Sequence, residues 1–133
     1  MCNEIVDKLK GNGFALIKCV VPPEHVEDVR KNVQNAVGSH RKPGLQNLLA
    51  YDQSFVPYLA DSRILKVSEK LMGEGIRISF TEPIINKPGT PRGGWHSDWP
   101  FHQKNAARIK APYTDALVSL STIWMLSSFT KEN

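Results

Sequence analysis

The hydrophobic pattern of this chain changes its period part-way along the sequence. Up to residue 72, apolar residues recur every three or four positions in several stretches, which is the spacing of one face of an α-helix. From residue 76 onward, the main apolar stretches alternate with polar residues or are rich in strand-forming types. Because most helices come before the strands instead of alternating with them, the pattern favours an α+β fold with antiparallel pairing.

Three helices are predicted in the first half of the chain, over residues 3–10, 23–37 and 62–72. The second is amphipathic, with valines at three- and four-residue spacing on one face and charges on the other. The residues predicted to begin or end these helices are, in order, Asn3, Gly11 with Gly13, Pro23, Gly38, Asp61 or Ser62, and Gly73 with Gly75.

Three strands are predicted, over residues 14–21, 76–85 and 117–126. In this second stretch, Ile76, Ile78 and Phe80 alternate with Arg77, Ser79 and Thr81, which is typical of a strand with one buried face. Residues 39–57 show neither period and are expected to be irregular. In the last strand, one face is predicted to carry Val118, Leu120, Trp124 and Leu126.

The composition is that of a single folded domain. With 133 residues, 41% hydrophobic and 23% charged, the chain suits one globular core. Its 17 basic and 13 acidic residues are spread along the sequence, whereas nucleic-acid binding usually requires a clustered basic face. We therefore expect no nucleic-acid partner.

The sequence also predicts a cytoplasmic protein with no membrane partner. No stretch approaches the 18 or so apolar residues of a transmembrane helix, and the N-terminus lacks the apolar core of a signal peptide. Two cysteines, Cys2 and Cys19, do not make a disulfide framework, so a reducing compartment is the simpler expectation.

One stretch, GGWHSDWPFHQ at residues 93–103, carries candidate metal ligands. If it is extended, His96 and Asp98 project from the same side, because alternate residues of a strand share a face. An imidazole nitrogen and a carboxylate oxygen suit iron(II), and a further histidine would complete a 2-His-1-carboxylate site. The alternative interpretation is a polar surface turn whose neighbouring aromatic residues only pack in the core, since a lone His-x-Asp is a weak motif.

The wider context of this motif resembles the phytanoyl-CoA dioxygenase family of iron(II)- and 2-oxoglutarate-dependent oxygenases. Residues 80–103 and 117–133 carry the resemblance, with residues 87–133 as its specific part, and residues 11–33 are similar to the opening of the family's domain. The matching elements are Lys87-Pro88, His96-Ser97-Asp98, Trp99-Pro100-Phe101, Trp124 and the turn at residues 129–133.

The resemblance implies a fold and a chemistry. The fold would be α+β, with N-terminal helices packed on a partial double-stranded β-helix (a jelly-roll or cupin-like incomplete barrel), as one domain over residues 1–133. The activity would be a hydroxylation of an unidentified small molecule, with Fe(II) held by His96 and Asp98 and with 2-oxoglutarate as co-substrate. Trp124 and residues 80–85 would line the co-substrate pocket or, as the alternative, belong to the core.

The sequence also departs from the family's pattern. The family's second metal histidine and its co-substrate arginine lie downstream of the turn at residues 129–133, and no histidine follows His102 here. We therefore expect a truncated form, the N-terminal portion of such a domain, with weak or no activity alone. The alternative is a non-catalytic binding or regulatory module, or an inactive fragment. An incomplete barrel would also leave an exposed sheet edge at residues 117–126, through which the chain could self-associate.

Overall fold

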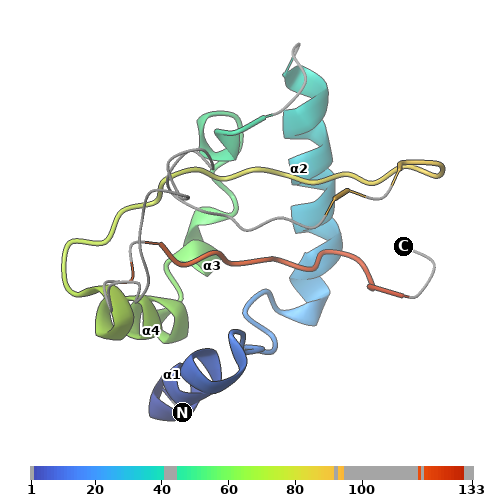
Figure 1. Ribbon diagram of the computed structural model, residues 1–133. Coiled ribbons are helices and arrows are strands. Elements are labelled where there is room, and N and C mark those ends of the chain that lie inside the picture. Colours follow the sequence, from blue (N-terminus) through green and yellow to red (C-terminus); the bar gives the residue numbers. More distant parts are fainter. Residues whose placement is uncertain (1, 41–44, 92, 95–116, 118, 131–133) are drawn as a thin grey trace, which may run out of the picture.

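The computed structural model describes residues 2–40, 45–91, 93–94, 117 and 119–130. Within these ranges the fold is helical, and the helices are joined by extended and turn segments (Figure 1). Two of the elements, labelled η1 and η2, are single turns of 3-10 helix, and the others are α-helices. The elements follow in the order α1 (Cys2–Asn12), η1 (Pro23–His25), α2 (Val26–Ser39), η2 (Leu48–Ala50), α3 (Val56–Leu59) and α4 (Ser62–Met72).

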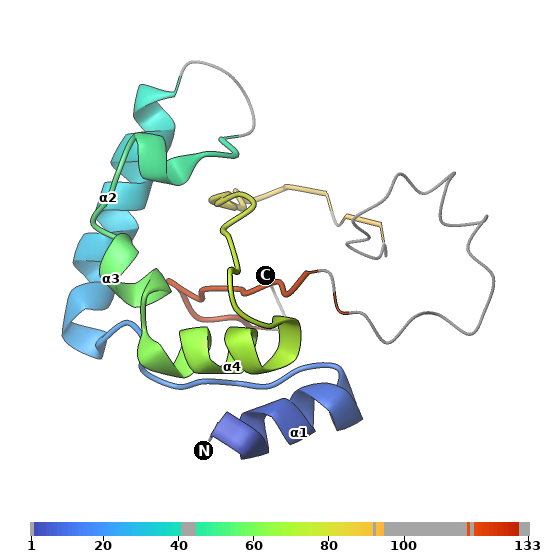
Figure 2. The ribbon, with the colours of Figure 1, turned by 90° about the vertical axis from the view of Figure 1, so that its left-hand side faces the viewer.

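The first and last helices form one packed unit. Ile5 and Val6 of α1 are buried together with Val67 of α4. The extended segment that leaves α1 runs alongside these two helices (Figures 1 and 2), and its residues Ala15 and Ile17 pack against the same cluster. This segment alternates in exposure, so its inward residues close the cluster.

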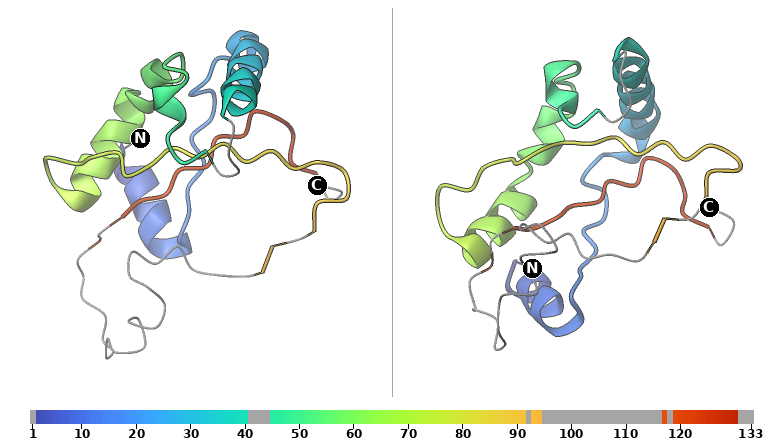
Figure 3. Two further views of the ribbon diagram at one scale, coloured as in Figure 1. Left: turned by 90° about the horizontal axis from the view of Figure 1, so that it is seen from above. Right: turned by 45° about the horizontal axis from the view of Figure 1, so that its top comes forward.

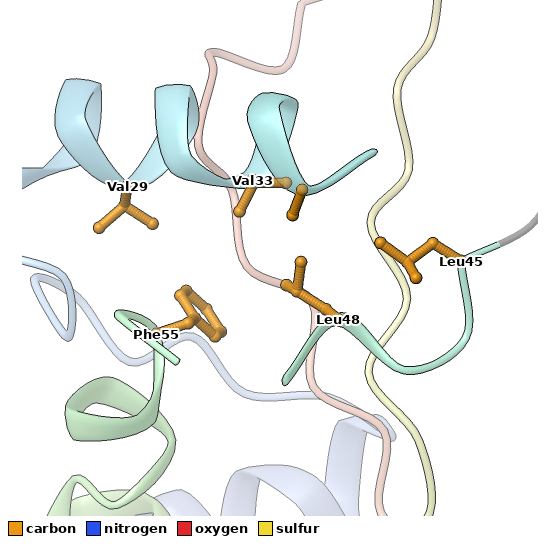
Figure 4. Close-up of a cluster of buried hydrophobic side chains, with 6 residues drawn as sticks. Val29, Val33, Leu45, Leu48 and Phe55 are labelled. Atoms are coloured by element: carbon orange, nitrogen blue, oxygen red, sulfur yellow. The ribbon is translucent and has the colours of Figure 1, made fainter. Parts of the chain in front are cut away.

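The second cluster lies on the apolar face of α2. Val29, Val33 and Ala36 of this helix are buried against side chains from the segment that follows it (Figure 4). That segment supplies Leu45, Leu48 of η2 and Phe55, which precedes α3. The valine spacing in α2 therefore predicted its buried face correctly, whereas residues 39–57, expected to be irregular, contain η2 and the beginning of α3.

Helix α4 is the best-predicted element. Asp61 caps it, since its carboxylate accepts a hydrogen bond from the backbone N–H of Arg63 at 2.8 Å. The helix ends at Gly73, as expected, and Gly73 has a φ of +84°. In contrast, α2 continues through Gly38 to Ser39, so the glycine predicted to stop it lies inside the helix.

Two glycines at the end of α1 give a matched stability prediction. Gly13 has a φ of +79°, where a side chain is disfavoured, so Gly13→Ala should destabilise the protein by roughly 1 kcal/mol. Gly11 lies inside α1 with ordinary φ and open space around it, so Gly11→Ala should raise stability by up to about 1 kcal/mol. Urea unfolding of both variants tests this. Effects of the same sign would contradict the assigned end of α1.

The predicted partial double-stranded β-helix is wrong for the described residues, which contain no sheet. Their one β-type pairing is an isolated parallel bridge between Asn47 and Thr81. In it, the N–H of Leu48 donates to the carbonyl of Thr81 at 3.0 Å, and the N–H of Thr81 donates to the carbonyl of Gln46 at 3.3 Å. The fold of this part of the chain is therefore helical, without the α+β architecture that the sequence suggested.

The bridge at Thr81 has physical reasons not to grow into a ladder. In an extended chain, residues two apart direct their backbone groups to the same edge, so Pro83 would be the next to pair on that edge. Proline has no N–H to donate, and the opposite chain turns into η2 at Leu48. The alternation of residues 76–85 therefore marks a chain able to form a strand, but it does not supply a partner.

The other extended segments differ from prediction in a similar way. Residues 76–85 and 119–126 lie on the same side of α2 and α3 and run in the same direction (Figures 1 and 3), which does not fit the expected antiparallel pairing.

The predicted apolar face of residues 76–85 points outward, since Phe80 is 63% and Ile84 is 80% exposed. In the second segment Trp124 and Leu126 do face the α2 cluster, although they belong to no strand. Within the described part, the sheet edge expected to drive self-association is therefore not formed.

Candidate functional site

The predicted metal ligands, His96 and Asp98, lie outside the described residues, as does His102. In the ranges that are described, no three His, Cys, Asp or Glu side chains come together in a way that could hold a metal ion. The two described histidines contact aromatic rings. His25 places Nδ1 3.1 Å from the hydroxyl of Tyr58, and His40 stacks edge-on against Tyr51 with ring centroids 5.2 Å apart.

The chain approaches the His-x-Asp motif through a formed turn. The N–H of Lys87 donates to the Thr90 hydroxyl, and the N–H of Thr90 donates to the carbonyl of Lys87, both at 2.9 Å. Pro88 and Gly89 occupy the centre, and Gly89 has a φ of +82°. This is the arrangement of a type II turn, with proline first and glycine second. The Lys-Pro element named in the resemblance is therefore present as a turn.

Trp124, the predicted co-substrate residue, packs into the core. Its ring meets Phe55 edge-on, with centroids 4.8 Å apart and planes at 76°. Its indole N–H donates to the Thr122 hydroxyl at 3.0 Å. Trp124 is therefore a half-buried residue packed against the α2 cluster, as in the core alternative. Its contact with a co-substrate stays a prediction.

An open groove of about 440 Å³ lies where residues 46–49 face residues 78–81. Leu49, Ile78 and Phe80 give it apolar lining, and the remaining lining residues are uncharged and polar. Phe80 and Thr81 belong to the segment predicted as a co-substrate wall, but Trp124 is not part of this lining. Among the described residues, the two predicted wall elements therefore do not share one groove.

A polar link that the sequence analysis missed joins α4 to the chain before η1. The guanidinium of Arg63 binds both carboxylate oxygens of Asp61, at 2.9 and 2.8 Å. It also donates to the carbonyls of Lys18 at 3.0 Å and Cys19 at 3.2 Å. The hydrogen bonds from Arg63 lower the pKa of the Asp61 carboxyl below its usual range. The sequence predicted the Asp61 cap. No sequence pattern indicated that Arg63 would bind the backbone of Lys18 and Cys19, which lie more than 40 residues earlier.

A second polar network connects α2 to the turn before α3. The amide of Asn32 donates to the Ser54 hydroxyl at 3.1 Å, and that hydroxyl donates to the carboxylate of Asp52 at 2.9 Å. The backbone N–H of Ser54 donates to the same carboxylate at 2.9 Å. Asn32 and Asp52 border a hollow of about 260 Å³, but their hydrogen bonds are made to each other through Ser54, so the network holds the turn in place.

Comparisons with protein-family models, with curated protein sequences and with solved structures gave no match. Among the described residues, no helix has the length and apolar character needed to cross a bilayer.

Proposed function

We propose that this chain contributes to an iron(II)- and 2-oxoglutarate-dependent dioxygenase of the phytanoyl-CoA dioxygenase type. The observation that carries the proposal is the His96-Ser97-Asp98 motif, which follows the Lys87-Pro88 turn. The donor set fits the metal, because a neutral imidazole and a carboxylate are the ligand types that non-haem iron(II) takes. When bound, iron with 2-oxoglutarate and O₂ supplies the oxidising power to hydroxylate an unreactive C–H bond of a small-molecule substrate.

The protein's own part in this proposal is to hold the metal and leave positions open for the co-substrate. His96 must be neutral to donate its nitrogen lone pair, so iron binding should weaken as the pH falls below about 6.5, the usual pKa of histidine. Two protein donors hold a metal less tightly than three. We therefore expect iron to bind this chain more weakly than it binds a complete three-ligand site.

Titration of the chain with iron(II) and 2-oxoglutarate without oxygen tests the proposal. Chelation of the metal by 2-oxoglutarate should give a visible charge-transfer band, and His96→Ala and Asp98→Ala should each remove it. His102→Ala is the matched control, because His102 is a neighbouring histidine without an assigned role, and the band should persist in this variant. A chain that gives no band, or a band that survives both ligand substitutions, would argue against the iron site.

A non-catalytic binding module is the second candidate function. The observation that favours it is the position of Trp124, whose ring packs on Phe55 and whose N–H donates to the exposed Thr122 hydroxyl, together with the open groove at residues 78–81. Formation of succinate from 2-oxoglutarate by this chain, at a rate that depends on His96, would exclude a non-catalytic module.

We also propose a cytoplasmic location, which is supported by the free thiols of Cys2 and Cys19.

A further inference from the structure

We draw no further inference here: the strongest candidate, the open and partly apolar groove between residues 46–49 and residues 78–81, carries none because nothing in the structure shows what covers it.

Discussion

Phe55→Ala is expected to lower the free energy of unfolding by about 4 kcal/mol. The Phe55 side chain is 5% exposed and packs between the valines of α2 and the ring of Trp124. Truncation to alanine removes the transfer free energy of the ring and leaves a cavity in the larger of the two clusters. Because this cluster joins α2, η2, the start of α3 and the segment at residues 124–126, the whole arrangement should lose stability together.

Urea unfolding followed by tryptophan fluorescence measures this effect. Phe129→Ala is the control, because Phe129 is 70% exposed, and it should change stability by less than about 0.5 kcal/mol. A double-mutant cycle of Phe55→Ala with Trp124→Leu should show a coupling of about 1 kcal/mol, the usual value for an edge-to-face aromatic pair. Similar losses for the exposed and the buried phenylalanine would mean that the cluster is not the core of the fold.

Arg63→Ala is expected to destabilise the protein by about 2 kcal/mol. The substitution leaves the Asp61 carboxylate without its two-pronged partner and the carbonyls of Lys18 and Cys19 without their donor. Arg63→Lys should recover little of this loss, because one ammonium cannot reproduce the planar fork that serves a carboxylate and two carbonyls together. Chemical unfolding of both variants tests the prediction. Full stability of the lysine variant would show that charge alone matters at this position.

The same link predicts a pH dependence with a definite sign. Arg63 lowers the pKa of Asp61 in the folded state, so folding favours the ionised carboxyl. The stabilisation is complete above the unfolded pKa of about 4 and is lost as the pH falls through the lower folded pKa. The difference between wild type and Arg63→Ala should therefore be constant near neutral pH and shrink in acid. Lys8→Ala, which removes an exposed ion pair with Glu4, should leave stability nearly unchanged at any pH.

The helices were predictable where local chemistry and periodicity agreed. In α4, the Asp61 cap, the apolar spacing around Val67 and the glycine after Met72 all indicate the same element, and the structure has it. In contrast, η2 and α3 have no periodic face of their own. Leu48 and Phe55 are buried because α2 offers them a surface, and that tertiary contact leaves no local signal in the sequence.

The sheet was mispredicted because alternation describes one strand and a sheet requires two. Residues 76–85 have the side-chain pattern of a strand, but Pro83 withholds a donor on the edge where Thr81 pairs, and the exposed face carries Phe80. The candidate site divides in the same way. The turn at Lys87 was predictable from its own residues, whereas the groove and the Arg63 link join segments about 30 or more residues apart in the sequence.

The packing of α1 against α4 sets the order in which the chain can gain structure during synthesis. The buried partner of Ile5 and Val6, Val67, is made some 60 residues after them. A helix of 11 residues is marginal in water without such a partner. Helix α1 therefore stays marginal until α4 has been made, and its apolar face is open to chaperones until then.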